Sequence, residues 1–292
     1  MRVGIGLPVT TTRTGGELLL AWARRAEEAG FDALTSIDRI VYPGFESMTA
    51  MAAAAAVTSR IGLRTNVLLA PARSAPMVAK QAASVDQISG GRFMLGIGVG
   101  RRTDDYEATG RDFHTRGRRL DADLEAMHAE WRGQPAGGRS RPSTVPPVRD
   151  GAVPVFFGGS LEAAIGRIVR WGVGWSVSSR GPEETHNNAE RVRDAWREAW
   201  REAGREGSPV IMVMHYFALG EDSNVDYLMD YYGYQGERAR MFADGAYRRA
   251  ADVTAALRDF AAIGVDEYTF VPTMADLTQV DRLADAVEAA GV

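Results

Sequence analysis

Short apolar runs of strand length alternate with helical segments along the whole chain. The predicted strands are Val3–Leu7, Ala33–Ile37, Leu63–Leu69, Phe93–Val99, Val153–Phe157, Val173–Val177, Val210–Leu219 and Asp266–Val271. The helical patterns between the first of them are Leu18–Ala29, Met48–Val57, Pro76–Ile88 and Arg116–Trp131. Eight strand–helix units match a (β/α)8 TIM barrel, although a doubly wound α/β sheet of this length has similar local patterns. The count of eight favours the barrel.

Composition limits the number of domains, the kinds of partner and the cellular location that we expect. The 292 residues are 45% hydrophobic and 25% charged, which suits one large domain over residues 1–292. A net charge of −4 gives no basic field for nucleic acid or for an anionic membrane. Because the chain has no cysteine and its four histidines form no zinc motif, we expect neither disulfides nor a metal site. With no secretory signal and no membrane-length apolar run, we expect a cytoplasmic location.

Two irregular segments interrupt the alternation. Residues 133–151 are rich in Gly, Pro and Arg, join a helix to the next strand, and are interpreted as a linker. Residues 221–247 follow the seventh predicted strand and hold five of the nine tyrosines. Since barrel active sites lie at the carboxyl ends of the strands, this insertion is the candidate lid or pocket wall. An extra helix packed on the barrel rim or on a partner subunit fits the same pattern.

The strand Phe93–Val99 and the residue after it carry glycines at 96, 98 and 100, which share one face. A flat ligand can approach such a backbone closely at the carboxyl end of the strand. Glycines at these positions also relieve crowding inside a narrow barrel. The spacing is not the dinucleotide fingerprint, so the pattern alone leaves both interpretations open.

Several longer motifs closely resemble the bacterial luciferase-like flavin-dependent oxidoreductases. They are AAAAAVTSRIGLRTNVLLAP at 52–71, AKQAASVD at 79–86, GGRFMLGIGVG at 90–100, YEATG at 106–110, FHTRGRR at 113–119, PVFFGGS at 154–160 and WGVGW at 171–175. The resemblance covers essentially the whole chain. It implies a barrel that binds reduced FMN or, in a sister branch, the 8-hydroxy-5-deazaflavin coenzyme, with the cofactor performing the difficult chemistry.

The resemblance leads to three hypotheses about activity. The first is a monooxygenase that uses reduced FMN, supplied by a separate NAD(P)H:flavin reductase, and molecular oxygen to oxidise a small organic substrate. The second is a deazaflavin-dependent enzyme that transfers only hydride. Its polyanionic coenzyme tail needs a positive groove, for which Arg101, Arg102 and Arg116 are the clustered candidates. The third is an inactive flavin-binding or interaction protein. A homodimer is possible, because the alanine-rich helix near 50–56 can pack on a partner or on the barrel strands.

The resemblance also implies a set of cofactor-binding residues. The end of the third strand, Asn66-Val67, corresponds to a site where relatives often have a non-prolyl cis peptide against the isoalloxazine ring, although Asn66 also fits a plain strand end. A phosphate corner is expected where a strand leads into a helix, because helix N-termini bind anions, but the same residues make an ordinary turn and N-cap. The cofactor-binding candidates are Asn66, Val67, Gly98, Gly100, Arg116, Gly158, Gly159, Ser160 and Trp175.

Candidate catalytic residues follow the second and fourth strands. Asp38 and Arg39 end the second strand, where many relatives have a histidine beside the reactive ring edge. Arg39 stays protonated, so it stabilises an anion rather than shuttling a proton, unless the two residues simply form a structural ion pair. His114 is the histidine with a route to the carboxyl face, although it also fits a structural role.

The substrate-pocket candidates are Arg101, Tyr231, Tyr232 and Tyr234. Arg101 and Arg102 replace an acidic residue of the sugar-phosphate-oxidising deazaflavin dehydrogenases, which argues against that activity. The two arginines also fit a solvated loop tip.

Overall fold

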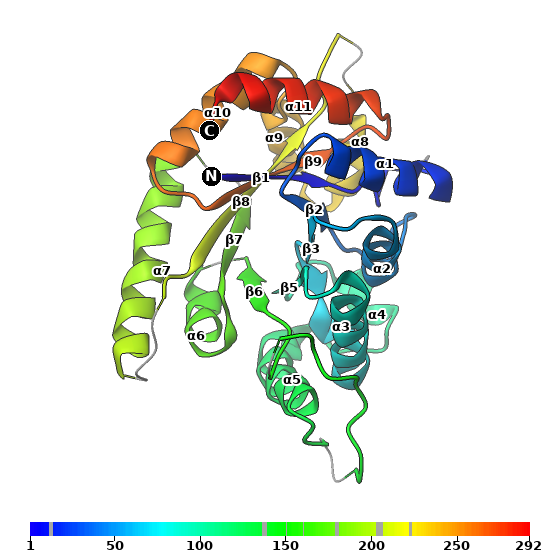
Figure 1. The fold of residues 1–292 in the computed structure, drawn as a ribbon, viewed down its shortest axis with the longest axis vertical. Coiled ribbons are helices and arrows are strands. Elements are labelled where there is room, and N and C mark those ends of the chain that lie inside the picture. The colour runs from blue at the N-terminus through cyan, green and yellow to red at the C-terminus, as the bar shows by residue number, and fades with distance from the viewer. Residues whose placement is uncertain are drawn as a thin grey trace.

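The strands of the computed structural model form one parallel sheet that closes on itself (Figure 1). The structure describes residues 1–11, 14–135, 139–149, 151–159, 161–178, 181–202, 207–221 and 224–292. The strands are β1 (Arg2–Gly6), β2 (Ala33–Ser36), β3 (Gly62–Thr65), β4 (Leu68–Leu69), β5 (Phe93–Gly98), β6 (Val155–Gly158), β7 (Gly174–Ser178), β8 (Val210–Phe217) and β9 (Glu267–Pro272). They lie in the order β3-β2-β1-β9-β8-β7-β6-β5-β4, and pairing of β3 with β5 closes the ring.

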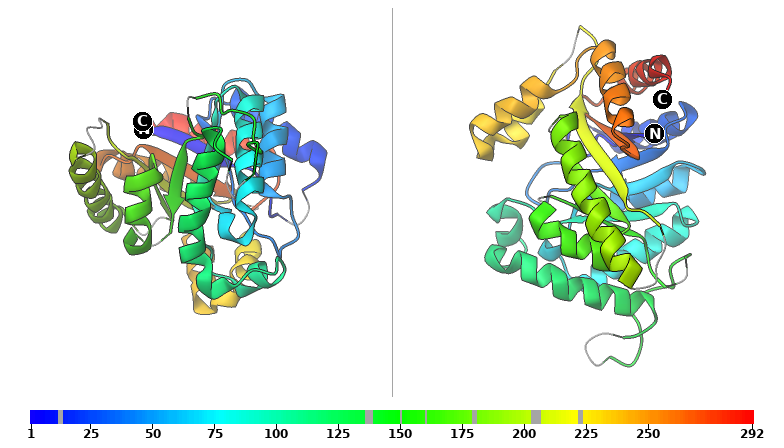
Figure 2. Two further views of the ribbon diagram at one scale, coloured as in Figure 1. Left: turned by 90° about the horizontal axis from the view of Figure 1, so that it is seen from below. Right: turned by 90° about the vertical axis from the view of Figure 1, so that its left-hand side faces the viewer.

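Helices surround this ring, and the two views of Figure 2 show them on its outer side. They are α1 (Gly16–Glu28), α2 (Ser47–Val57), α3 (Ala75–Ser89), α4 (Thr103–Glu107), α5 (Arg116–Trp131), α6 (Leu161–Trp171), α7 (Pro182–Glu202), α8 (Asp226–Tyr231), α9 (Glu237–Gly245), α10 (Ala250–Ala262) and α11 (Thr278–Ala290), with short 3₁₀ turns η1 (Ala70–Ala72), η2 (Phe113–Thr115) and η3 (Gly233–Gln235). Within the described part of the chain, no helix combines the length and the apolar character that a membrane crossing requires.

The predicted (β/α)8 TIM barrel with an insertion after its seventh strand is confirmed. The prediction was wrong in one detail, because the expected strand Leu63–Leu69 is divided into β3 and β4. The peptide bond between Asn66 and Val67 is cis and lies in the gap. After the gap the chain pairs with β5 again, with Leu68 opposite Ile97. The barrel therefore has eight strand positions although its sheet contains nine labelled strands.

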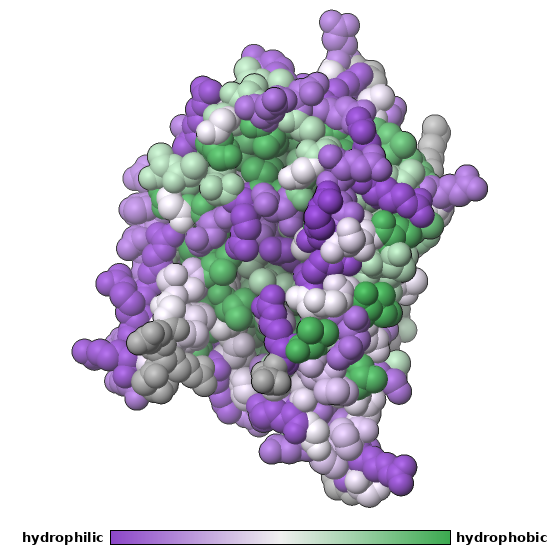
Figure 3. Space-filling view, viewed as in Figure 1, coloured by the Kyte–Doolittle hydropathy of each residue, from purple (hydrophilic) through white to green (hydrophobic). Residues whose placement is uncertain are grey.

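The hydrophobic core lies between the outer side of the barrel and the helices. On α1 the buried residues Leu19, Trp22, Ala23 and Ala26 follow helical spacing and form one apolar stripe. Along a strand, every second side chain points to this core, as in the buried Val3 and Ile5 of β1. In the space-filling view, hydrophilic side chains cover much of the outline and hydrophobic residues show between them (Figure 3).

The barrel interior is partly polar near the amino ends of the strands. The Arg64 guanidinium on β3 lies 2.8 Å from the Glu267 carboxylate on β9, and both side chains are buried. Burial raises the pKa of Glu267, whereas Arg64 opposes this shift. The pair lies at the opposite end of the strands from the site described below.

The two irregular segments differ in structure. The described part of 133–151 contains neither helix nor strand and is fastened by hydrogen bonds, among them Ser143 N to Glu130 and Val148 N to Asp86. The tyrosine-rich segment after β8 forms α8, η3 and α9. In Figure 2 these gold helices project from one end of the barrel.

Candidate active site

A cavity of about 520 Å³ lies at the carboxyl ends of the strands, under the helices that follow β8. Cofactor and substrate pockets commonly have volumes of ~300–1,000 Å³. Eleven of the candidate residues line the cavity: Asp38, Arg39, Asn66, Val67, Gly100, Arg101, Gly158, Gly159, Tyr231, Tyr232 and Tyr234. The fold therefore brings together residues from five separate segments of the chain, and their individual roles stay predictions.

Asn66 and Val67 form the floor of the cavity. The Ser176 hydroxyl on β7 donates to Asn66 Oδ1 over 2.9 Å, which fixes the orientation of the Asn66 amide. Asn66 is only 6% exposed, and its amide nitrogen makes no hydrogen bond with any described residue. A buried amide donor beside a cavity is suited to an acceptor atom on a bound molecule.

The glycines of β5 and β6 make room for Val67. A Cβ atom on Gly98 would lie 2.5 Å from Val67 Cγ2, and one on Gly158 would lie 2.7 Å from Val67 Cγ1. At Gly96 the obstacles are the Thr65 carbonyl oxygen and the Phe156 ring. The crowding interpretation therefore fits Gly96 and Gly98, and Gly98 does not line the cavity.

Three other glycines border the cavity directly. Gly100 has φ +66°, and a Cβ there would lie 2.8 Å from Leu69 Cδ2. Gly158 ends β6, Gly159 follows it, and both expose backbone to the cavity. Trp175 is buried behind them and donates from Nε1 to the Gly159 carbonyl over 3.3 Å, so it supports this turn without lining the cavity. Ser160 lies outside the described residues.

Asp38 is held by the segment after β4. Its carboxylate accepts from Leu69 N at 2.8 Å and from both terminal nitrogens of Arg73 at 2.7 and 3.0 Å. Burial raises the pKa of the Asp38 carboxyl, and the Arg73 guanidinium opposes this shift. Because both oxygens are already bonded, Asp38 anchors η1 beside the cavity.

Arg39 is paired with a different partner. Its Nε donates to Asp105 over 2.8 Å, and its Nη2 donates to the Val41 carbonyl over 3.0 Å. Asp105 also accepts from Ile40 N and Val41 N, so one carboxylate fixes the arginine and its loop. The structural ion pair between Asp38 and Arg39 that the sequence left open is wrong. Successive residues point to opposite sides of an extended chain, which separates the two side chains.

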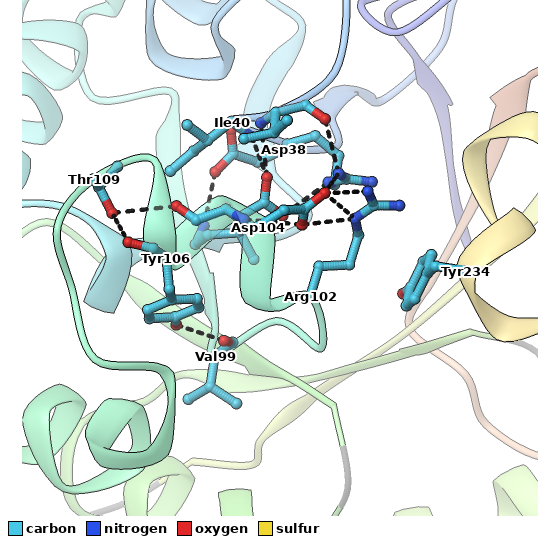
Figure 4. A network of polar contacts seen from close by, with 12 residues as sticks. Asp38, Ile40, Val99, Arg102, Asp104, Tyr106, Thr109 and Tyr234 are labelled. Carbon is cyan, nitrogen blue, oxygen red and sulfur yellow. Dashed lines mark hydrogen bonds and ion pairs between the residues drawn. The ribbon is translucent and has the colours of Figure 1, made fainter.

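The arginines proposed for a positive groove lie in different environments. Arg102 pairs with Asp104, and its guanidinium carbon is 4.5 Å from the centre of the Tyr234 ring (Figure 4). Arg116 donates to the Phe113 carbonyl and lies 3.7 Å from the centre of the Phe113 ring, away from the cavity. Arg101 is exposed at the cavity rim and makes no ion pair with the described residues.

His114 lies on the exposed turn η2 and does not line the cavity. Its ring contacts Phe113 edge to face, with centroids 5.7 Å apart. Figure 4 shows the neighbouring Tyr106, whose hydroxyl donates to the Val99 carbonyl over 2.6 Å. This bond ties α4 to the residue after β5.

Aromatic residues from the insertion and from β8 form one wall. Tyr216 and Tyr232 share a hydrogen bond of 2.7 Å between their hydroxyls, and Tyr232 stacks on Phe242 with centroids 4.1 Å apart. Tyr42 donates to Asp230 over 2.6 Å, which connects the loop after β2 to α8. The insertion therefore packs on the barrel rim and also contributes the cavity wall. The predicted pocket wall and the predicted extra helix on the rim each describe part of its position.

Several cavity residues had no clear signal in the sequence. Asp105 lines the cavity and Arg73 lies behind Asp38 without lining it, and both act through ion pairs with residues 66 and 35 positions away, which no local pattern reveals. Arg238 on α9 lies at the rim and, like Arg101, has no ion pair with the described part of the chain. Three other cavity residues could have been predicted, because the period of two along β7 and β8 places their side chains on the inner side of the barrel: Ser176, Met214 and Tyr216.

The chain belongs to the luciferase-like monooxygenase family, whose model matches residues 1–291. Its structure is similar to that of monooxygenase RslO1 from Streptomyces bottropensis, with a TM-score of 0.77, 21% identity and coverage of 99% of this chain and 98% of the other. It is also similar to the oxygenating constituent of 3,6-diketocamphane monooxygenase from Pseudomonas putida, a type II Baeyer–Villiger monooxygenase solved with FMN. Here the TM-score is 0.74 and the identity 16%, with coverage of 99% and 96%.

A sequence relative has the other cofactor chemistry. The F420-dependent glucose-6-phosphate dehydrogenase of Kribbella flavida is 32% identical over 141 residues, which are 45% of this chain and 42% of the dehydrogenase. The family thus includes monooxygenases and oxidoreductases that depend on F420, the 8-hydroxy-5-deazaflavin coenzyme of the second hypothesis.

Proposed function

We propose that the protein is a flavin-dependent monooxygenase that binds reduced FMN in the cavity and oxidises a small organic substrate with molecular oxygen. The proposal rests on the contacts of the arginines that were predicted for a positive groove. Arg102 pairs with Asp104 and Arg116 does not line the cavity, so of these three arginines Arg101 alone is unpaired at the cavity among the described residues, which is little positive charge for a polyanionic coenzyme tail. FMN carries a single phosphate and needs less.

The residues present fit a flavin ring. The unpartnered amide nitrogen of Asn66 and the exposed backbone of Gly158 and Gly159 border the same cavity. Val67 offers an apolar surface that the glycines beneath it hold in place. When bound, reduced FMN supplies the electrons and the reactive atom for oxygen chemistry.

The chain's own residues then orient and shield the reaction. Asn66, fixed by Ser176, holds one edge of the site, and the tyrosine wall excludes water from it. Asp105 holds the Arg39 side chain at the cavity, and because the pair carries no net charge, Arg39 acts there as a hydrogen-bond donor rather than as a free cation. Under this proposal a separate NAD(P)H:flavin reductase supplies the reduced flavin.

Deazaflavin-dependent hydride transfer is the second candidate. Two observations favour it: Arg101 and Arg238 are unpaired among the described residues at the rim, and the Kribbella relative uses F420. A coenzyme tail lying across the rim would meet both guanidinium groups.

Anaerobic titration with reduced FMN and with F420 distinguishes the two candidates when it includes a charge reversal at the rim. Arg238→Glu should weaken F420 binding about tenfold if the tail crosses the rim, and FMN binding less than about twofold. Arg240→Glu is the matched control, because Arg240 is exposed on the same helix but does not line the cavity. Tighter binding of reduced FMN supports the monooxygenase. Tighter binding of F420 that Arg238→Glu weakens and Arg240→Glu does not would assign hydride transfer instead.

A further inference from the structure

We propose that the cavity takes a neutral aromatic substrate whose carbonyl oxygen accepts a hydrogen bond from the Tyr231 hydroxyl. The proposal names the substrate class of the cavity and rests on the proposed function for the reaction that follows binding. It begins from a difference among the tyrosines that surround the cavity.

The hydroxyl of Tyr231 has no hydrogen-bond partner among the described residues, although the side chain lines the cavity and is only 6% exposed. Its neighbours are all bonded. Tyr216 bonds to Tyr232, Tyr227 to Thr10, Tyr42 to Asp230 and Tyr234 to Gln235. The oxygen of this hydroxyl is not fully buried, so it faces open space in the cavity, where an acceptor on a ligand can take the place of water.

Tyr231 keeps the proton that it needs to act as a donor. Burial raises the pKa of its hydroxyl well above the usual value, so the proton stays in place at any physiological pH. The Arg39 guanidinium carbon lies 5.4 Å from the centre of the Tyr231 ring and opposes that shift. A protonated phenol donates to acceptors such as a carbonyl oxygen.

The charges around Tyr231 favour a neutral ligand over a carboxylate. Arg39 is neutralised by Asp105, and the buried Asp38 by Arg73. A carboxylate placed beside Tyr231 would thus be a buried anion without a free cation, which costs more than one hydrogen bond returns. A ketone or aldehyde oxygen satisfies the hydroxyl without that cost.

The walls favour a flat ring. Tyr232 and Phe242 stack with an interplanar angle of 21°, and Tyr231 meets Tyr232 edge to face at 80° with centroids 4.9 Å apart. Because the hydroxyl of Tyr232 is already bonded to Tyr216, this wall offers ring surface rather than polar groups. Aromatic ligands pack on such surfaces with offset or edge-to-face geometry.

Two planar probes test the proposal on the full-length protein by calorimetry. 2-Acetylnaphthalene carries the carbonyl oxygen, and 2-isopropenylnaphthalene replaces it with a CH₂ group of similar shape. Wild-type protein should bind the ketone about five- to tenfold more tightly, as expected for one neutral hydrogen bond. Tyr231→Phe should bind both probes equally. Tyr227→Phe, which removes the hydroxyl bonded to Thr10 outside the cavity, should keep the preference.

The proposal is overturned if the wild type shows no preference, if Tyr231→Phe retains it, or if neither probe binds. Titration of the same proteins with reduced FMN separates this outcome from failure of the proposed function. Flavin binding without a ketone preference removes only the substrate assignment. A ketone preference that Tyr231→Phe abolishes, in a protein that binds no reduced FMN, removes only the monooxygenase.

Discussion

The contact between Gly98 and Val67 gives a prediction whose size follows from the structure. In Gly98→Ala the new Cβ would lie 2.5 Å from Val67 Cγ2, about 1 Å closer than carbon atoms normally approach. The next atom is Val67 Cβ at 3.5 Å, which is an ordinary contact, so Val67 is the sole obstacle within 4 Å. Overpacking of this kind costs about 1–3 kcal/mol of unfolding free energy.

A double-mutant cycle isolates this term. Val67→Ala deletes the methyl group that the new Cβ would meet, so Gly98→Ala should cost little in that background, with a coupling energy of about 1–3 kcal/mol. Gly166→Ala is the control, because nothing lies within 4 Å of a Cβ at this exposed position of α6. It should stabilise the protein by about 0.5–1 kcal/mol, since alanine favours a helix interior over glycine.

Urea unfolding followed by far-ultraviolet circular dichroism measures all five proteins, the wild type included. The reasoning is refuted if Gly98→Ala is as stable as the wild type. It is also refuted if the double variant is no more stable than the sum of the two single changes predicts.

Two further predictions concern buried charge and protonation. Asp105→Ala removes the closer of the two carboxylates beside the buried Arg39 guanidinium and leaves only Asp104 at 3.7 Å, so it should lower the unfolding free energy by about 3 kcal/mol, whereas Asp194→Ala, which removes an exposed pair with Arg197, should change it by less than about 1 kcal/mol. Equal urea midpoints for the two variants would contradict the role given to Asp105. Burial between aromatic rings lowers the pKa of His128 from 6.5 to about 4. Because the unfolded chain takes up a proton first, stability is full above pH ~6.5 and falls by up to about 3 kcal/mol as the pH approaches 4, at ~1.4 kcal/mol per pKa unit. Urea midpoints of wild type and His128→Phe at pH 7.5 and 5 test this, and a pH dependence that is unchanged in the variant would exclude His128 as its source.

The barrel could be predicted from the sequence because the hydrophobic pattern of a strand followed by a helix repeats eight times along the chain. Each strand is a short apolar run and each helix a longer patterned one, so small errors at element ends do not alter the count. The division of the third strand was not predicted, since Asn66-Val67 has ordinary strand composition, and only the resemblance implied a cis peptide there.

The polar contacts of the site were less predictable because they depend on distant pairs. Adjacent in sequence, Asp38 and Arg39 suggested one ion pair, yet their partners are Arg73 and Asp105. Gly98 shows a related limit: a glycine that admits a ligand and one that admits a neighbouring side chain look alike until Val67 is placed.

The tethers of the insertion limit how the cavity wall of this protein can be exchanged. Tyr227 on α8 bonds to Thr10 in the loop after β1, and Asp230 bonds to Tyr42 in the loop after β2. The segment that forms the cavity wall is thus hydrogen-bonded to two loops that lie near the N-terminus of the chain. A chimera that takes only α8 and α9 from another protein without Tyr227 and Asp230 would lose both hydrogen bonds. An exchange of the cavity wall therefore requires the loops after β1 and β2 to be exchanged together with the insertion.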